Sequence, residues 1–207
     1  MRIGIACEGE PPPTELLEIL EAAGLPAASP RDERPPALLP AAGGVWLLAT
    51  GTDVLRACDR GGLDLGVIGR DLLLEGRRGA ADLLDLRCCR DDLVFAATAA
   101  ADRPGHTLRV ATRHPETTRR HFAAKGLQPD ILAMDEPVLA PALGLADGVV
   151  EVTSRLAAER PGAPALETRA VVAVCGARLV AARASRVLLR RDIGALVDRL
   201  RSALEER

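Results

Sequence analysis

The sequence predicts an α/β protein built from two lobes. Stretches typical of strands and of helices alternate along its 207 residues, as in α/β proteins with mainly parallel sheets. A chain of this length suffices for one large domain or two small ones. One block ends near residue 87, a second spans 88–170, and the last strand and helix are expected to return to the first. We therefore predict lobe I from residues 1–87 plus 171–207, lobe II from residues 88–170, and a central cleft between them, where ligands usually bind.

Each predicted element follows from its hydrophobic period and from the residues at its ends. Strands are predicted at residues 1–6, 44–50, 63–69, 92–99, 108–113, 129–134, 147–152 and 166–175. Helices are predicted at residues 14–25, 53–62, 70–76, 115–126 and 185–206. Asp53 is the expected N-cap of the second helix, and Pro115 suits the first turn of the fourth. Residues 26–43 are rich in Pro, Ala and Gly and predict a loop or an irregular hairpin. Residues 137–146 form an apolar turn or helix.

The last predicted helix is long and amphipathic. Its apolar residues recur with a helical period, which predicts one face turned toward the core. The side chains expected to point inward are Val187, Leu188, Ile193, Leu196, Val197, Leu200 and Leu204.

Composition excludes several classes of function. The formal net charge is −2 and aromatic residues make up 1% of the chain. The net charge therefore does not favour binding to nucleic acid or to an anionic membrane, and the low aromatic content argues against base-stacking modules. The first residues lack the features of a signal peptide, and no apolar run approaches the ~20 residues that cross a bilayer. We expect a cytoplasmic protein.

The five cysteines lack the spacing of a zinc site. The adjacent pair Cys88 and Cys89 raises a redox interpretation. Against it, we expect all five to be small buried apolar residues in a reducing compartment. His114 and His121 lie far from any Cys/His cluster, so no metal ligand is assigned. No Ser/His/Asp or Cys/His constellation indicates a catalytic nucleophile, and no catalytic residue is assigned.

Three stretches together resemble one family, the short-form ATP phosphoribosyltransferases. They are "GGLDLGVIGRDLLLE" (61–75), "RVATRHPETTRRHFAAKG" (109–126) and "LAPALGLADGVVEV" (139–152). The resemblance covers most of residues 44–207 and only loosely residues 1–43. It implies a fold like that of type II periplasmic binding proteins. It also implies transfer of phosphoribose from phosphoribosyl pyrophosphate (PRPP) to N1 of ATP, with Mg²⁺, in the first step of histidine biosynthesis.

The resemblance extends to partners. Family members form dimers that build hexamers, or hetero-octamers with a synthetase-like regulatory subunit. Short chains of the family lack the C-terminal regulatory domain that binds histidine, and the resemblance implies the same for this chain. The resemblance therefore implies a homo-oligomer that works with a regulatory subunit.

PRPP needs backbone N–H groups for its 5′-phosphate and a carboxylate for its ribose hydroxyls. The resemblance places these functions on Asp147, Glu151 and the turn Thr153, Ser154 and Arg155. Strand and helix capping is the alternative role for Asp147 and for the Thr-Ser pair.

A second set of residues resembles the family segment near the nucleotide. Gly69 is expected to let the backbone approach a ligand, with Arg70 and Asp71 at a helix start. A plain strand-to-helix turn capped by Asp71 is the alternative. Among the arginines of 109–126, Arg113, Arg119 and Arg120 are candidates to face anions, although a solvated helix face also explains the last two.

The chain departs from the family at positions expected to face ligands. A basic turn after the first strand is replaced by Cys7, Glu8, Gly9 and Glu10. Thr50 stands for an arginine and Val138 for a glutamate, with Glu136 nearby but out of register. The phosphate turn "TSRL" is about one residue short and lacks a glycine, the residue that admits positive φ and close backbone approach.

Two hypotheses follow, because fold does not determine function. The first is a drifted ATP phosphoribosyltransferase catalytic subunit. The second is a paralogue that phosphoribosylates another acceptor, or a non-catalytic ligand-binding or regulatory subunit. An extracytoplasmic solute receptor shares the two-lobe fold, but the expected cytoplasmic location opposes it.

Overall fold

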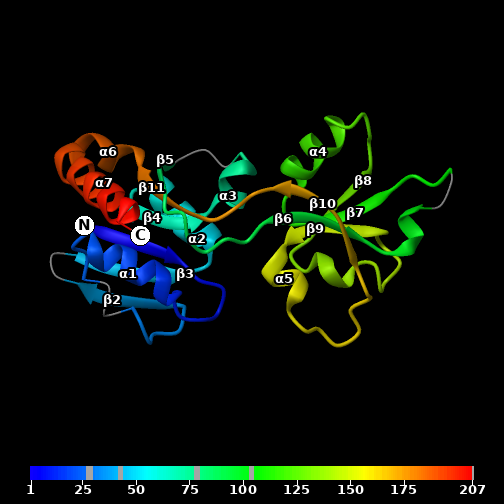
Figure 1. Cartoon of the computed structure of the whole chain (residues 1–207), viewed down its shortest axis with the longest axis horizontal. Coiled ribbons are helices and arrows are strands. Elements are labelled where there is room, and N and C mark those ends of the chain that lie inside the picture. Colours follow the sequence, from blue (N-terminus) through cyan, green and yellow to red (C-terminus); the bar gives the residue numbers. More distant parts are fainter. Residues whose placement is uncertain (27–29, 42–43, 77–79, 103–104, 207) are drawn as a thin grey trace. The chain divides into compact units, whose positions relative to one another are not determined.

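The computed structural model describes residues 1–26, 30–41, 44–76, 80–102 and 105–206. Its contacts divide the chain into two compact units (Figure 1). Unit 1 comprises Met1–Leu73, Arg77–Arg90 and Gly176–Arg207, and unit 2 comprises Leu74–Gly76 and Asp91–Cys175. Apart from the short segment Leu74–Gly76, the chain changes unit at 90/91 and 175/176, compared with the predicted lobe boundaries at 87/88 and 170/171.

Unit 1 is a six-stranded mixed sheet in the order β2-β3-β1-β4-β11-β5. Its strands are β1 (Arg2–Ala6), β2 (Ala37–Ala41), β3 (Gly44–Ala49), β4 (Leu65–Gly69), β5 (Ala80–Asp85) and β11 (Ala177–Ala182). Strands β3, β1 and β4 are mutually parallel, whereas β2, β11 and β5 each pair antiparallel with a neighbour. β2 and β3 form the hairpin anticipated in the Pro-rich segment.

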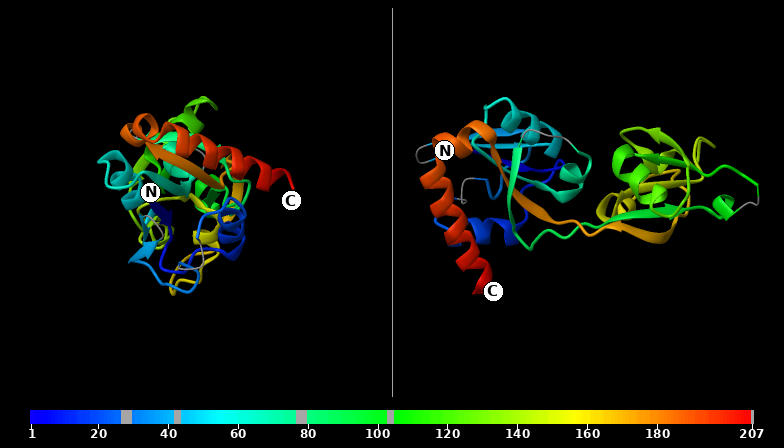
Figure 2. Two further views of the ribbon diagram at one scale, coloured as in Figure 1. Left: turned by 90° about the vertical axis from the view of Figure 1, so that its left-hand side faces the viewer. Right: turned by 90° about the horizontal axis from the view of Figure 1, so that it is seen from above.

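Helices cover the sheet of unit 1 and complete its core. They are α1 (Thr14–Ala22), α2 (Gly51–Asp59), α3 (Arg70–Leu74, whose last residue belongs to unit 2), α6 (Arg183–Leu188) and α7 (Arg190–Glu205). α7 lies beside α1 (Figures 1 and 2), where Arg199 Nε donates to the carbonyl of Ala23 at 2.7 Å. Trp46 and the apolar faces of these two helices are buried together. The chain's last helix therefore packs on its first.

Unit 2 is a five-stranded mixed sheet in the order β10-β6-β9-β7-β8. Its elements are β6 (Leu93–Ala97), η1 (Ala99–Asp102), β7 (Arg109–Thr112), α4 (Pro115–Ala123), β8 (Asp130–Ala133), η2 (Pro137–Leu139), β9 (Gly148–Val152), α5 (Thr153–Ala157) and β10 (Glu167–Ala173). β9 is fully buried and pairs parallel with β7 and antiparallel with β6. This central place of β9 positions the predicted phosphate turn, which follows it directly as the start of α5.

The prediction that the sheets are mainly parallel was wrong. Among the strand pairs of the described residues, four are parallel and five are antiparallel. Strands β5 and β11 were not predicted at all. β11 is alanine-rich and buried and has a single β-branched residue, Val180, so neither composition nor alternation marked it. It is nevertheless the strand that carries the chain into the sheet of unit 1 after unit 2.

The N-cap predicted for α2 was also wrong. Thr50 is the N-cap: its hydroxyl accepts from the Asp53 N–H at 3.3 Å and donates to the Asp53 carboxylate at 3.0 Å. Asp53 sits three residues further on, in a reciprocal arrangement like that of a capping box. Thr50, the residue that replaces the family's arginine, therefore has a local structural role.

The predicted helix at 185–206 is broken. α6 ends at Leu188 and α7 begins at Arg190, so residues before and after Leu189 do not share one helical face. Ile193, Leu196, Val197 and Leu200 are buried as predicted. Val187 and Leu188 are instead 75% and 80% exposed, which contradicts the inward orientation predicted for them.

We expect this difference to show in stability. Leu196→Ala removes a fully buried side chain from the core of unit 1 and should lower the free energy of unfolding by about 2–5 kcal/mol. Leu188→Ala makes the same chemical change at an exposed position and should cost less than about 0.5 kcal/mol. Urea denaturation of the two variants measures both values. Equal losses would mean that Leu188 is buried in the folded protein.

Candidate functional site

The predicted site residue Asp147 lies immediately before β9, in an ion pair. Its carboxylate accepts from the Arg109 backbone N–H at 2.9 Å, from Arg109 Nη2 at 3.0 Å, and pairs with His106 Nε2 at 2.8 Å. Burial by itself raises the pKa of Asp147, but these hydrogen bonds outweigh it and hold the pKa at about 2. The structure therefore gives Asp147 a fixed negative charge that is neutralised within its own unit.

The same arrangement occurs in unit 1. Arg2 begins β1 as Arg109 begins β7, and Asp64 precedes β4 as Asp147 precedes β9. Asp64 accepts from the Arg2 backbone N–H at 2.7 Å and from Arg2 Nη2 at 3.0 Å, and the Ser185 hydroxyl adds a bond of 2.8 Å. Burial raises the pKa of Asp64, but the bonds from Arg2 and Ser185 outweigh it and hold it at about 2. Because unit 1 contains a matching Arg–Asp pair, the alternative, structural role of Asp147 is supported. The role of Asp147 in binding PRPP stays a prediction.

The predicted phosphate turn already holds an acid of this chain. The Asp91 carboxylate accepts from the Thr153 hydroxyl at 2.9 Å, from the Ser154 N–H at 2.8 Å and from the Ser154 hydroxyl at 2.5 Å. Asp91 comes just before β6, and the Thr153 N–H donates to the neighbouring carbonyl of Asp92 at 3.0 Å. Asp91 therefore occupies three donors of the turn that the sequence predicts to bind phosphate.

The cation of the turn is also paired with acids. Arg155 Nη2 lies 2.7 Å from Glu136 Oε1, and Arg155 Nε lies 3.4 Å from Glu151 Oε2. Glu151 is completely buried, and its other oxygen accepts from the Val152 N–H at 2.8 Å. Arg160 joins the group through Glu136 at 3.5 Å and donates to the carbonyl of Arg155. The positive charges of two arginines are thus neutralised by the negative charges of two glutamates beside the turn.

The sequence-based interpretation missed two members of this site, Asp91 and Arg160. Asp91 stands 63 residues before Ser154, and no local pattern links the two. A pair of consecutive acids, Asp91 and Asp92, before a buried strand is the signal that was available. Glu136 was noted only as out of register with the family; the structure brings it to Arg155.

Gly69, Arg70 and Asp71, predicted to bind nucleotide, lie in unit 1 at the end of β4 and the start of α3. A Cβ atom at Gly69 would fall 2.1 Å from Asp71 Oδ1, so glycine lets the Asp71 side chain fold back over the turn. The Arg70 N–H donates to the carbonyl of Gly176 at 3.0 Å. The turn is built as predicted, and its nucleotide-binding role stays a prediction.

The end of the same family segment belongs to unit 2. Glu75 accepts from the N–H groups of Glu116 and Thr117 at 2.7 and 3.0 Å, in the first turn of α4. Arg120 of α4 also donates to the carbonyl of Leu74. Arg120, one of the arginines expected to face anions, therefore binds backbone here, and Arg119 pairs with Glu116 at 2.5 Å.

The structure also shows where the other residues that depart from the family pattern lie. Val138 is buried in η2, and Glu8 and Glu10 are exposed after β1. Glu10 lies 3.8 Å from Arg34 in an exposed ion pair. Four of the five cysteines are buried as expected, Cys89 is half-buried, and none of the five forms a disulfide. Burial is the main cause that raises the pKa of Cys7 and of Cys58 to about 12, so both remain thiols.

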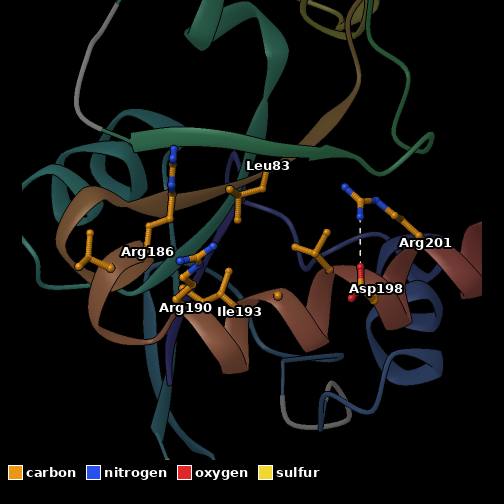
Figure 3. A pocket seen from close by; sticks show the side chains of 9 residues that line it. Leu83, Arg186, Arg190, Ile193, Asp198 and Arg201 are labelled. Atoms are coloured by element: carbon orange, nitrogen blue, oxygen red, sulfur yellow. Dashed lines mark hydrogen bonds and ion pairs between the residues drawn. The ribbon is translucent and has the colours of Figure 1, made fainter.

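A groove of ≈ 640 Å³ lies in unit 1, between β5 and the helices α6 and α7. Figure 3 shows Arg186, Arg190 and Arg201 around it, with Arg201 paired to Asp198 at 3.1 Å. No predicted site residue lines this groove. We therefore place the candidate site at the turn that begins α5, where polar donors converge on an anion, rather than in the groove.

Within the described residues, no helix has the length and apolar character needed to span a membrane.

Among solved structures, the ATP phosphoribosyl transferase (HisG:HisZ) complex from Thermotoga maritima has a chain that superimposes with a TM-score of 0.74 at 22% identity, covering 100% of both chains. The periplasmic aliphatic sulphonate binding protein SsuA from Escherichia coli gives 0.55 at 14% identity, covering 99% of this chain and 72% of that one. These likenesses confirm the predicted two-sheet α/β fold of the periplasmic-binding-protein type.

Sequence comparison identifies the family. A family model described as HisG: ATP phosphoribosyltransferase matches residues 50–202. An ATP phosphoribosyltransferase of Pseudomonas paraeruginosa is 36% identical over 199 residues, which cover 93% of this chain and 92% of that protein. One of Pseudomonas putida is 36% identical over 163 residues, covering 78% and 76%. The chain therefore belongs to the ATP phosphoribosyltransferase family.

Proposed function

We propose that the chain transfers phosphoribose from PRPP to N1 of ATP, the first step of histidine biosynthesis, and that the turn Thr153–Arg155 receives the 5′-phosphate of PRPP. Family membership supports the reaction. One observation supports the place: two hydroxyls and one N–H of this turn converge on the two oxygens of the Asp91 carboxylate. That carboxylate stands in for a phosphate, because both are oxyanions that accept charge-assisted hydrogen bonds.

Phosphate binding at this turn requires Asp91 to leave it. A phosphate and a carboxylate 4–5 Å apart repel each other by roughly 3–4 kcal/mol per pair of unit charges at an effective dielectric near 20. The donors that hold Asp91 belong to short side chains and backbone and remain in place when it turns away. Asp91 therefore competes with the substrate for one set of donors.

Arg155 supplies positive charge at the turn, and its guanidinium is held by an ion pair with the buried Glu151 at 3.4 Å. Catalysis in this arrangement is by positioning and charge stabilisation rather than by a general base. The Mg²⁺ belongs to the substrate, since this ion is usually bound by phosphate oxygens with only one or two carboxylates. It neutralises the pyrophosphate as that group leaves.

Partners are part of the proposal. The solved Thermotoga maritima structure is described as a HisG:HisZ complex. By analogy, this chain forms a dimer or higher oligomer and works with a synthetase-like regulatory subunit. ATP is its acceptor, and Gly69, Arg70 and Asp71 of unit 1 are its proposed nucleotide-binding residues.

A second candidate function is favoured by the same carboxylate. Asp91 occupies the turn in unit 2, and Glu8 and Glu10 of unit 1 stand where the family has a basic turn. Each unit therefore has an acid at a position where polyphosphate binding needs donors or cations. A paralogue that uses another acceptor, or a subunit that binds ligands without catalysis, fits these acids.

The reaction is tested with purified protein, ATP, PRPP and Mg²⁺, with and without the regulatory subunit, by mass spectrometry of the product. We expect phosphoribosyl-ATP.

Ser154→Ala removes a hydroxyl donor of the turn and should raise the KM for PRPP about tenfold, because hydrogen bonds to charged groups contribute about 1.5–3 kcal/mol. The control, Ser202→Ala, removes an exposed hydroxyl of α7 and should leave KM unchanged.

Calorimetry then separates the two functions. Binding of PRPP without ATP and without product favours another acceptor. Absence of both binding and product, in a folded protein supplied with its regulatory subunit, rejects the catalytic proposal and favours the non-catalytic one.

A further inference from the structure

Two adjacent thiols and one carboxylate meet in unit 1, away from the phosphate turn. Glu15 belongs to the first turn of α1, and Cys88 and Cys89 lie between β5 and β6. The ligand atoms of these three side chains all lie within 4.8 Å of one another. The two sulfur atoms are 3.6 Å apart, and the Cys89 N–H lies 3.5 Å from Glu15 Oε2. Within the described ranges, no other three His, Cys, Asp or Glu side chains come together in this way.

The backbone explains how neighbouring thiols reach the same point. In an extended chain, adjacent side chains point to opposite faces. Here Arg87 and Cys89 have φ of 52° and 53°, in the left-handed region that residues with a side chain rarely adopt. The segment is anchored on both sides, because the Leu86 N–H and the Cys88 carbonyl each bond to Ala177 of β11 at 3.0 Å. The thiols are therefore brought together by tertiary structure.

The separation of the sulfurs matches that of two ligands on one metal ion. Thiolates that each bind a tetrahedral Zn²⁺ at about 2.3 Å are about 3.8 Å from each other. In a disulfide, the sulfurs are only about 2 Å apart. Two thiolates with one carboxylate also form a donor set that suits Zn²⁺ better than Mg²⁺ or Ca²⁺, which prefer oxygen ligands only.

We propose that Cys88, Cys89 and Glu15 bind a thiophilic divalent cation of the Zn²⁺ class, with a fourth position left to water. Cys88 is buried, whereas Cys89 is half-buried and Glu15 is exposed, so the ion enters from the side of Glu15. Both thiols lose their protons to solvent on binding, so about two protons are released for each ion.

The site links two parts of unit 1. It ties the start of α1 to the segment that ends at Arg90, where the chain passes into unit 2. A bound ion would hold that segment in the strained backbone that it already adopts. The proposal does not depend on the phosphoribosyltransferase reaction, since none of its ligands belongs to the phosphate turn.

Titration of the reduced, metal-free full-length protein with Co²⁺ tests the proposal, because thiolate ligands on Co²⁺ give a charge-transfer absorption. We expect one ion per chain with this absorption, and competition by Zn²⁺. Cys89→Ser should weaken the affinity for Zn²⁺ by about tenfold or more and reduce the thiolate absorption. Glu15→Gln should weaken the affinity while the absorption remains.

Cys58→Ala is the matched control, because Cys58 is a buried thiol of the same unit that lies in a different core cluster. The Cys58→Ala variant should bind Co²⁺ with the same affinity and the same thiolate absorption as the wild type. Circular dichroism shows whether each variant is folded; Cys89 is half-buried, so serine is tolerated there. Absence of thiolate absorption in the folded wild type would overturn the proposal, as would equal binding by the wild type and folded Cys89→Ser.

Discussion

Asp91→Asn is expected to raise the affinity for ribose 5-phosphate and for PRPP by about tenfold or more. The change removes one negative charge from the donors of Thr153 and Ser154, which Asp91 contacts at 2.5–2.9 Å. Neutral hydrogen bonds are about half as strong as charge-assisted ones, so an asparagine competes less well with a phosphate. A gain of 1.4 kcal/mol corresponds to a tenfold change in Kd. Isothermal titration calorimetry on the folded variants measures it.

Asp92→Asn is the matched control. It removes the same charge one residue away, but its side chain accepts from the Cys175 N–H at 3.1 Å instead of from the turn. The asparagine amide oxygen retains that bond. If both variants gain affinity equally, the effect is one of net charge, and Asp91 does not compete for the donors of the turn.

The two Arg–Asp pairs are expected to dominate the loss of stability in acid. Asp64 and Asp147 have a pKa of about 2 in the folded protein, compared with about 3.9 in an unfolded chain. A lowered pKa stabilises the fold above the unfolded value, and this stabilisation is lost as pH falls from about 4 to about 2. Asp64→Asn and Asp147→Asn should therefore each cost about 1–2 kcal/mol at pH 7 and almost nothing near pH 2. This range allows for solvent screening at the half-exposed arginines.

Urea denaturation at pH 7, 4 and 2.5 measures this dependence. Asp198→Asn is the control, because Asp198 forms an exposed ion pair with Arg201 that should contribute less than about 0.5 kcal/mol. A constant difference between wild type and Asp147→Asn at every pH would show that the ion pair is not the source of the stabilisation.

Local signals in the sequence predicted much of the fold. Pro115 marked the start of α4, and the alternating blocks identified β1, β3, β4, β6 and β9. Both signals act over a few residues, where hydrophobic period and capping are strong. Local signals failed where burial came from distant neighbours: β11 was missed, and a break at Leu189 turned Val187 and Leu188 outward.

The candidate site was predicted only in part for the same reason. The three family-like stretches located the turn after β9. They did not predict that Arg109 neutralises Asp147 or that Arg155 lies between two glutamates. Such pairs join residues that the strand order brings together, since β7 and β9 are neighbours in the sheet although 35 residues separate them.

The sequence by itself determined the family, the α/β class and the position of the polar turn after β9, because these depend on motifs and periods within short stretches. Only the tertiary structure decided what each charge contacts. Asp91 reaches Ser154, and Glu15 reaches Cys89, through strand pairing and helix packing that close distances of 63 and 74 residues. Electrostatic and metal-binding chemistry depends on separations of a few ångströms, and spacing along the chain does not encode them.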